Sequence, residues 1–251
     1  MNNILDNKNF FEIIASDYDE MIPFSEAVER KKKSFSKIIK PGMKTAIDLG
    51  CGTGSDSVAL ALLGLKVTAF DPSLEMLKYA LANAQKEGVE INFEKSTIDE
   101  IPRNLNNKYD LVVSMGNTFT NVKHKSFNDS IQKCYDILNE QGLLIIQVLN
   151  YEKIISEGKR IVNIKEGSKN YFIRFYDFIG GEIVFNVLIF NKFNPNANKL
   201  FSTKIYPHLA DDFESELEKT GFDSISFYAD LESTKFDKLQ SKDLIIKAIK
   251  E

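Results

Sequence analysis

Glycines at alternate positions and two aspartates form the part of the sequence whose residue types and spacing best suit chemistry. In segment 46–54 (AIDLGCGTG), an apolar run leads into Gly50, Gly52 and Gly54, and a helical pattern begins directly afterwards. Glycine tolerates positive φ and lets the backbone touch a ligand, and a helix N-terminus presents free N–H groups with a partial positive charge. This turn therefore predicts a binding site for a ligand that contacts the backbone.

Asp71 supplies the second part of the predicted site. It follows the apolar segment 66–70 (KVTAF), so it should lie at the same sheet edge as the glycine turn and accept hydrogen bonds from both hydroxyls of a ribose. The turn lacks the third glycine of the G-x-G-x-x-G pattern of dehydrogenases, and Asp48 would repel a pyrophosphate but can pair with a cationic amino-acid moiety. The alternative is a purely structural turn in which Asp71 caps the helix 73–87.

Strands and helices alternate between residues 45 and 150, which is typical of a parallel sheet with crossover helices. The predicted strands are 45–49, 66–70, 91–95, 109–114 and 143–149. The predicted helices are 55–63, 73–87 and 126–138, ended by Gly64, Gly88 and Gly142. Right-handed crossovers then predict a doubly wound, mostly parallel, Rossmann-like α/β sheet, completed to seven strands by 223–229 and 242–249 after the helix 211–219.

Two further segments should cover this core, which comprises 45–150 and 209–251. Residues 1–44 are predicted to be mainly helical over 8–40, to stop at Pro41-Gly42 and to cover the bound ligand. Residues 151–208 contain the predicted strands 159–164, 169–179, 182–192 and 199–206, with turn signals at Gly180-Gly181 and Asn194-Pro195-Asn196. We therefore expect an antiparallel β insertion after the fifth strand, lying as a lid over the carboxyl edge of the sheet.

The charge balance, the cysteines and the lack of long apolar segments limit the partners and the location that we expect for the protein. The 251 residues carry 32 basic and 36 acidic side chains, a net charge of −4, which disfavours a broad nucleic-acid footprint. The basic run 30–33 is interpreted as a solvated helix face. Cys51 and Cys134 do not predict a disulfide framework, and no segment has the pattern of a signal peptide or a membrane span. We expect a soluble, cytoplasmic protein that contacts no membrane and holds no metal.

Four stretches resemble class I S-adenosylmethionine-dependent methyltransferases, and within them the glycine N-methyltransferase and glycine/sarcosine methyltransferase group. The stretches are 48–81 (DLGCGTGSDSVALALLGLKVTAFDPSLEMLKYAL), 109–119 (YDLVVSMGNTF), 142–159 (GLLIIQVLNYEKIISEGK) and 204–217 (KIYPHLADDFESEL). The first carries the resemblance in fold and cofactor, and the other three indicate the subgroup. The resemblance implies an enzyme whose cofactor is S-adenosyl-L-methionine and whose cofactor product is S-adenosyl-L-homocysteine.

Carried over position by position, the resemblance implies contacts at the methionine end of the cofactor. Tyr18 and Arg30 would approach its carboxylate, and Asp48 and Gly50 would line its amino-acid end. Asn117 would face the methyl group that is transferred. The alternative for Tyr18 is an aromatic side chain that only packs helices together.

The same resemblance implies contacts at the nucleoside end. Asp71 would hold the ribose, Pro72 and Met76 would flank the adenine, Thr97 and Ile98 would edge it, and Met115 would lie under the ribose. Met76 and Ile98 could equally be core residues. Many relatives have an acidic or amide side chain where Thr97 stands, and its shorter hydroxyl puts that adenine contact in doubt.

The residues expected around the methyl acceptor differ from those of the glycine-specific enzymes. They carry an arginine that grips the substrate carboxylate where this chain has Leu149, and a histidine where it has Asn121. Leucine cannot form a charge-assisted pair, so glycine is not the expected acceptor. Arg174 could restore acid recognition if it points inward. We expect it to point outward, because the alternate residues on its strand are bulky aromatics that would fill the inner face.

The acid/base candidates lie on the predicted lid. Methyl transfer from a sulfonium depends largely on positioning, and a neutral amine acceptor needs no strong base. His208 is the acid/base candidate, and Tyr171 and Tyr206 are candidates for the acceptor pocket. The predicted catalytic residues are Asn117, Tyr206 and His208. The alternative for His208 is a turn histidine packed by Pro207. No cysteine nucleophile or cluster of metal ligands is predicted.

Three functions remain open from the sequence. The favoured one is N- or O-methylation of a small molecule. The second is methylation of RNA or protein, although the Asn/Asp-Pro-Pro-aromatic motif of many such enzymes is absent, since the fourth strand leads into 114–117 (SMGN). The third is a non-catalytic module that binds the cofactor, because fold resemblance alone does not prove turnover.

Overall fold

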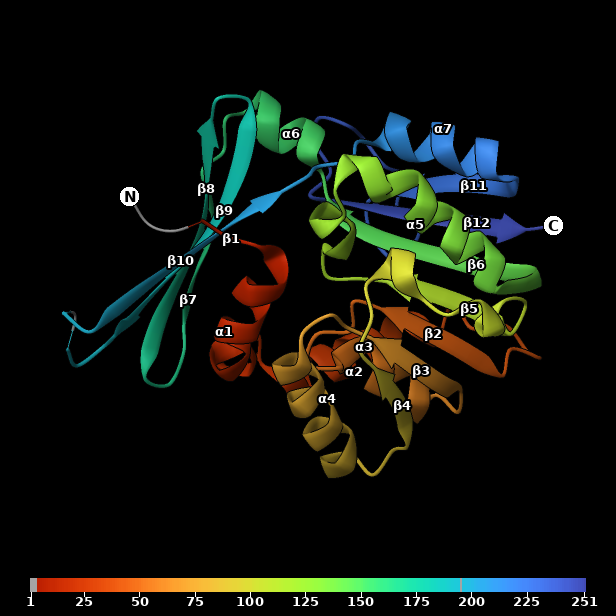
Figure 1. Ribbon diagram of the computed structural model, residues 1–251, viewed down its shortest axis with the longest axis horizontal. Coiled ribbons are helices and arrows are strands. Elements are labelled where there is room, and N and C mark those ends of the chain that lie inside the picture. The colour runs from red at the N-terminus through yellow and green to blue at the C-terminus, as the bar shows by residue number, and fades with distance from the viewer. Residues whose placement is uncertain (1–3, 195) are drawn as a thin grey trace.

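Two β-sheets, which we call the central sheet and the side sheet, organise the computed structural model, and it describes residues 4–194 and 196–251 (Figure 1). The central sheet has the order β11-β12-β6-β5-β2-β3-β4 and the side sheet the order β1-β10-β9-β8-β7. The central strands are β2 (Thr45–Leu49), β3 (Lys66–Phe70), β4 (Ile91–Glu94), β5 (Tyr109–Ser114), β6 (Leu138–Leu149), β11 (Phe222–Tyr228) and β12 (Asp243–Lys250). The side strands are β1 (Ile4–Leu5), β7 (Ile161–Glu166), β8 (Asn170–Ile179), β9 (Glu182–Asn191) and β10 (Asn198–Ile205).

Helices cover both faces of the central sheet. The α-helices of the described residues are α1 (Asn7–Met21), α2 (Phe24–Phe35), α3 (Ser55–Leu62), α4 (Leu74–Lys86), α5 (His124–Ile137), α6 (Tyr151–Ser156) and α7 (Ala210–Thr220), of which α1 and α6 pack on the side sheet instead. On one face Phe127 of α5 and Phe213 of α7 pack in one apolar cluster with Ile146 of β6. On the other face Val28 of α2 packs in a second cluster with Ile145. Both faces of the central sheet are therefore buried under helices, as is usual for a parallel sheet.

The central sheet confirms the predicted α/β fold. β4, β3, β2, β5 and β6 pair in parallel, and β12 and β11 pair antiparallel at the end of the sheet. From β2 the chain continues to β3 on one side of the sheet and later returns to β5 on the other side, so the strand order reverses at β2. In open α/β sheets, ligands bind at such a switch point, outside the carboxyl ends of the strands. The glycine turn after β2 lies at this position.

The side sheet confirms the predicted antiparallel insertion and adds a strand. β7, β8, β9 and β10 pair antiparallel in sequence order, whereas β1 pairs in parallel with β10, which places Ile4 opposite Ser202. The predicted turn at 194–196 includes Pro195, which lies outside the described residues. The prediction for residues 1–44 missed the strand β1, because two residues carry no readable alternation pattern.

Two predicted helix boundaries are wrong. The helix expected over 8–40 is divided, because α1 ends at Met21 and Pro23 is the N-cap of α2. Proline fixes φ and has no N–H to continue the first helix. Gly142 does not terminate a helix, because α5 ends at Ile137 and the chain enters β6 at once.

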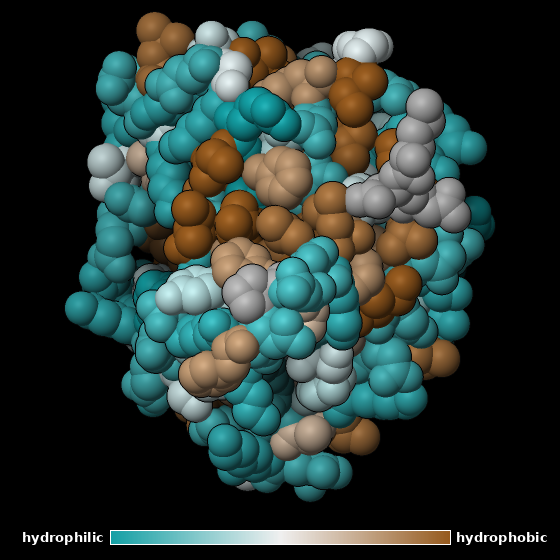
Figure 2. Space-filling model, turned by 90° about the vertical axis from the view of Figure 1, so that its left-hand side faces the viewer, coloured by the Kyte–Doolittle hydropathy of each residue, from teal (hydrophilic) through white to brown (hydrophobic). Residues whose placement is uncertain are grey.

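α1 lies between the side sheet and the rest of the molecule (Figure 1). Its Phe10 and Ile14 share an apolar cluster with Phe172, Val187 and Ile189 of the side sheet. The opposite, outer face of that sheet carries apolar side chains gathered across its middle (Figure 2). Among the described residues, no helix is long and apolar enough to cross a membrane.

Candidate functional site

The turn after β2 has the backbone that its glycines were predicted to provide. Gly50, Gly52 and Gly54 have φ values of +77°, +55° and +89°, which side chains other than glycine rarely adopt. A Cβ atom at Gly50 would lie 2.3 Å from Cγ2 of Thr118, whereas one at Gly52 would meet no atom within 4 Å. The turn is therefore packed closely at Gly50 and open at Gly52.

Asp71 connects the ends of β2 and β3. Its Oδ2 accepts a hydrogen bond from the N–H of Gly52 at 2.9 Å, and its Oδ1 accepts one from the N–H of Ser73 at 2.9 Å. The N-cap of α4 is Ser73, whose Oγ accepts from the N–H of Met76 at 3.1 Å, so the alternative that Asp71 merely caps this helix is wrong. Burial raises the pKa of Asp71 to about 6.

A cavity of about 720 Å³ opens at this edge of the central sheet. It brings together seven of the predicted cofactor residues: Tyr18, Arg30, Gly50, Asp71, Pro72, Met76 and Met115. Residues of α1 and α2 line it, whereas no described residue of the side sheet does. α1 therefore covers the cavity, and the insertion stands behind α1 rather than closing the sheet edge directly.

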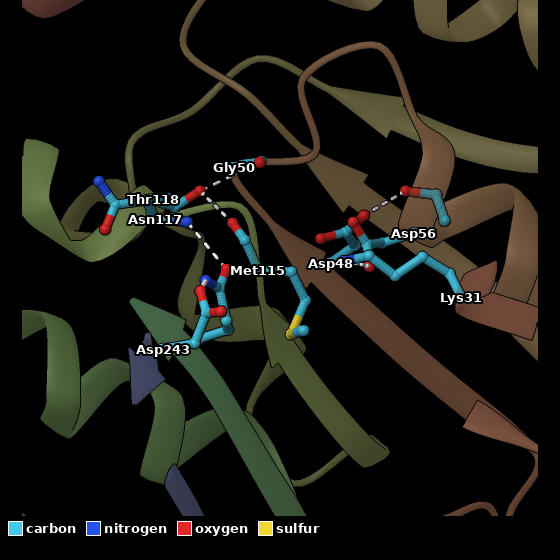
Figure 3. A network of polar contacts seen from close by, with 10 residues as sticks. Lys31, Asp48, Gly50, Asp56, Met115, Asn117, Thr118 and Asp243 are labelled. Atoms are coloured by element: carbon cyan, nitrogen blue, oxygen red, sulfur yellow. Dashed lines mark hydrogen bonds and ion pairs between the residues drawn. The ribbon is translucent and has the colours of Figure 1, made fainter. Parts of the chain in front are cut away.

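Acidic side chains and one lysine gather on one side of the cavity (Figure 3). Lys31 Nζ lies 2.6 Å from Oδ1 of Asp56, and both residues line the cavity with little exposed side-chain surface. Lys31 belongs to the basic run interpreted as a solvated helix face, and that interpretation is wrong for this residue. Spacing alone missed Asp56, although its place in the first turn after the glycine turn was a usable signal.

Another polar network lies across the cavity, at the end of β6 (Figure 3). Nε2 of Gln147 donates to Oδ1 of Asp243 at 2.7 Å, and its Oε1 accepts from the N–H of Asn117 at 3.2 Å. Gln147 and Asp243 both line the cavity, and burial raises the pKa of Asp243. Neither residue was predicted as part of the site, because the two meet only when β12 pairs with β6.

Comparison with known proteins agrees with this geometry. Residues 46–142 match the family model described as a methyltransferase domain. The glycine/sarcosine N-methyltransferase of Aphanothece halophytica is 25% identical over 229 residues, which cover 90% of this chain and 84% of that protein. The glycine N-methyltransferase of Homo sapiens is 30% identical over 148 residues, 53% of this chain and 50% of that protein. The CcbJ methyltransferase from Streptomyces caelestis superposes with a TM-score of 0.80 at 16% identity, over 97% of this chain and 98% of that one.

The chain is a class I S-adenosylmethionine-dependent methyltransferase. Its cofactor is S-adenosylmethionine, as the glycine turn and Asp71 predicted. The resemblance to the glycine N-methyltransferase group is likewise confirmed.

Asp48 of the methyltransferase lies behind the cavity wall. Its side chain is 1% exposed and accepts a hydrogen bond from Oγ of Ser57 at 2.6 Å, and it does not line the cavity. Burial, reinforced by the nearby charge of Asp56, raises the pKa of Asp48 to about 7. This placement does not support the expected direct contact between Asp48 and the amino-acid end of the cofactor. Asp56 is the acidic residue that reaches the cavity on this side.

The adenine contacts predicted after the third strand are not part of the cavity. Thr97 is exposed and Ile98 is buried in the apolar cluster beneath α5, and neither lines the cavity. Ile98 is therefore a core residue, which was the alternative to its predicted contact with the adenine. Met76 combines both predicted roles, since it is buried against α1 and also lines the cavity.

Asn117 occupies a strained position but turns its side chain away from the cavity. Its φ is +70°, its Nδ2 donates to Oη of Tyr151 at 2.8 Å and Oγ1 of Thr120 at 2.9 Å, and its Oδ1 accepts from the N–H of Leu149 at 2.9 Å. Its neighbours Gly116 and Thr118 line the cavity. In this arrangement Asn117 shapes the turn, and its amide does not face the transferred methyl group as predicted.

The acid/base role predicted for His208 is wrong. The ring is 3% exposed, stacks on Phe127 with centroids 4.0 Å apart, and its Nε2 lies 2.9 Å from the carbonyl oxygen of Val122. Burial lowers the pKa of His208 to about 4, so the ring is neutral at physiological pH. Tyr206 also lies outside the cavity and its N–H donates to the carbonyl of Thr120 at 2.7 Å.

The two remaining candidates on β8 lie on opposite faces of the side sheet. Tyr171 stacks on Phe190 and does not line the cavity, which contradicts its predicted pocket role. Arg174 lies on the same face as the buried Phe172 and Tyr176, so the expectation that it points outward is wrong.

Proposed function

We propose that this methyltransferase methylates the nitrogen of a small molecule other than glycine. The observation that carries the proposal is the environment of Leu149, at the position where the resemblance to the glycine-specific enzymes implies a carboxylate-binding arginine. Leu149 packs with Tyr151, Tyr176 and Ile154 in an apolar cluster. A carboxylate brought to this position would lose its hydration and gain no cationic partner, at a cost of several kcal/mol. Methylation of small amines is supported by relatives named glycine/sarcosine N-methyltransferase.

The described residues fit the cofactor. The space beside Gly52 is free of protein atoms within 4 Å of a Cβ position, and the carboxylate of Asp71 lies at its edge. In the proposal, Asp71 holds the ribose hydroxyls, Pro72 and Met76 flank the adenine, and Tyr18 and Arg30 approach the methionine carboxylate. Met115, which also lines the cavity, would lie beneath the ribose.

The chemistry needs little from the protein beyond positioning. Bound S-adenosylmethionine would supply a methyl group on a sulfonium, from which S-adenosylhomocysteine leaves readily as a neutral thioether. The residues of α1 and α2 form part of the cavity wall, and the turn 115–118 contributes the wall at the acceptor side. Alignment of acceptor and donor can account for several kcal/mol of the barrier. An amine acceptor gives up one proton, and Asp243 is a carboxylate in the cavity wall that could receive it.

A transfer assay with methyl-labelled cofactor tests the proposal. The panel contains amines, amino acids, sugars and hydroxylated aromatics, with transfer RNA and a protein extract as separate arms. We expect label in a small amine, identified as an N-methyl product by mass spectrometry, and no efficient turnover of glycine. Label confined to RNA or protein, or an O-methyl product, would contradict the proposal. Leu149→Arg is the companion variant, and glycine turnover gained only there supports a shared site geometry.

A further inference from the structure

The outer face of the side sheet carries a row of large apolar side chains. Phe172 of β8 is fully buried on the inner face, so its neighbour Ile173 points outward. Ile164 of β7 and Leu188 of β9 lie opposite Ile173, and Leu200 of β10 lies opposite Leu188. These four outward-pointing residues, which we call the apolar row, therefore cross four neighbouring strands on one face of the sheet.

The apolar row is open to solvent. Ile164 and Leu200 at its two ends are 64% and 37% exposed, and Ile161 beside it is 50% exposed. The apolar clusters that the described residues form on the inner face, with α1 and α6, include no residue of the row. Figure 2 shows the apolar side chains gathered on this outer face. A contiguous apolar surface of this kind on a folded chain marks an interaction site.

The polar side chains at the centre of the same face are satisfied within the chain. Nδ2 of Asn186 donates to Oδ2 of Asp177 at 3.0 Å, and Oγ of Ser202 donates to Oδ1 of Asn186 at 2.6 Å. Asn186 and Ser202 are only 3% and 5% exposed. A partner that covers this face therefore takes no unpaired polar group of this network out of water, and the desolvation penalty for burying it is small.

The charges of the outer face cancel in pairs. Within the described strands β7 to β10, the charged side chains that point outward form ion pairs inside the chain. The pairs are Glu166 with Lys192, Asp177 with Arg160, and Glu182 with Lys204. Such a face has no excess of cations to attract an anionic membrane or a nucleic acid. Its chemistry fits another apolar surface of balanced charge, and the same face of a second copy is one.

We propose that two copies of the chain dimerise by packing these outer faces against each other around a twofold axis, as in an isologous interface. β8 and β9 are ten residues long. At about 3.3 Å per residue and about 4.8 Å between strands, a four-stranded face of this length covers roughly 600 Å². Two such faces together bury on the order of 1,200 Å², which reaches the size of a specific interface. The inference does not depend on which acceptor is methylated.

Sedimentation velocity of the full chain at micromolar concentration tests the proposal. We expect the wild type to sediment with twice the chain mass of 28.5 kDa. Ile164→Glu and Leu200→Glu each place an unpaired charge at one end of the apolar row, and the twofold axis repeats that charge, so each variant should weaken the dimer at least hundredfold. Leu239→Glu is the matched control, because Leu239 is 64% exposed like Ile164 but lies outside the side sheet, and it should dimerise as the wild type does.

A milder pair of variants keeps the test readable if a glutamate unfolds the side sheet. Ile164→Ser and Leu200→Ser remove apolar area without adding charge, and each should weaken the dimer at least tenfold. Melting temperature checks that every variant is folded. Co-sedimentation with vesicles of phosphatidylcholine, with and without phosphatidylglycerol, separates a second copy from a lipid surface, and we expect no binding to either.

The inference is overturned if the wild type sediments as a monomer. It is also overturned if folded Ile164→Ser and Leu200→Ser dimerise as tightly as the wild type, since the interface would then lie elsewhere on the molecule. Equal dissociation of the Leu239→Glu control would show that an added surface charge, and not the apolar row, controls association. Vesicle binding that the serine variants abolish would assign the row to a lipid surface instead.

Discussion

The N–H of Gly52 donates to Oδ2 of Asp71 at 2.9 Å, so one carboxylate both braces the glycine turn and borders the cofactor cavity. A ligand bound at Asp71 therefore meets a carboxylate whose position is already set by the backbone. Preorganisation of this kind reduces the ordering cost of binding.

Asp71→Asn should weaken S-adenosylhomocysteine binding at least tenfold, because a charge-assisted hydrogen bond contributes about 1.5–3 kcal/mol. Calorimetric titration measures the change. Asp110→Asn is the matched control, because Asp110 also accepts backbone N–H bonds, from Lys44 and Thr45, but lies outside the cavity. The control should lose stability and keep its affinity, and an equal loss of affinity in both variants would argue against a ribose contact.

The buried carboxyl of Asp48 should make the ligand-free protein less stable as the pH rises from about 4 to about 7. Its pKa is raised from 3.8 to about 7, so in this interval the folded chain holds a proton that the unfolded chain has released, and the free energy of unfolding falls with rising pH until the folded chain also loses the proton. One fully linked group contributes a slope of up to about 1.4 kcal/mol per pH unit. Thermal melts of the wild type and Asp48→Asn should show a flatter profile for the variant. Identical slopes would refute the linkage.

His208 should produce a slope of the opposite sign between about pH 4 and pH 6.5. Its pKa is about 4 in the folded chain, against an ordinary 6.5, so the unfolded chain binds the extra proton and stability falls as the pH drops through this interval. His208→Gln should lower the melting temperature at pH 7, flatten the profile between these pH values, and leave kcat/KM unchanged within about twofold. A large loss of kcat/KM in a folded variant would restore a catalytic role for the ring.

Gly50→Ala should abolish cofactor binding and cost more stability than Gly64→Ala. Both glycines have positive φ, which costs other residues about 1–2 kcal/mol. A Cβ at Gly64 meets no atom within 4 Å, whereas one at Gly50 meets Thr118 at 2.3 Å. Chemical denaturation of the two variants isolates the contribution of this contact, and equal losses would show that only φ matters.

The cofactor-binding part of the site could be predicted, because the residues that form it lie close together in sequence. A buried strand, three alternating glycines and an aspartate at the next strand end determine that half of the site within 26 residues, 46–71. Gln147 and Asp243 could not be predicted, since they meet only through the pairing of β6 with β12. The prediction that Arg174 points outward was wrong for a different reason. Aromatic side chains occupy both alternating sets of β8, so the pattern alone does not identify the inner face.

The pairing of β1 with β10 has a consequence for the connection between the side sheet and the cofactor cavity. α1 follows β1 directly, packs on the side sheet through Phe10 and Ile14, and lines the cofactor cavity through Phe11 and Tyr18. The wall over the cofactor and the side sheet are thus joined through one helix. A cofactor in the cavity and a ligand on the side sheet would both act on that helix, and by thermodynamic linkage any effect of one on the affinity of the other is returned to the same degree.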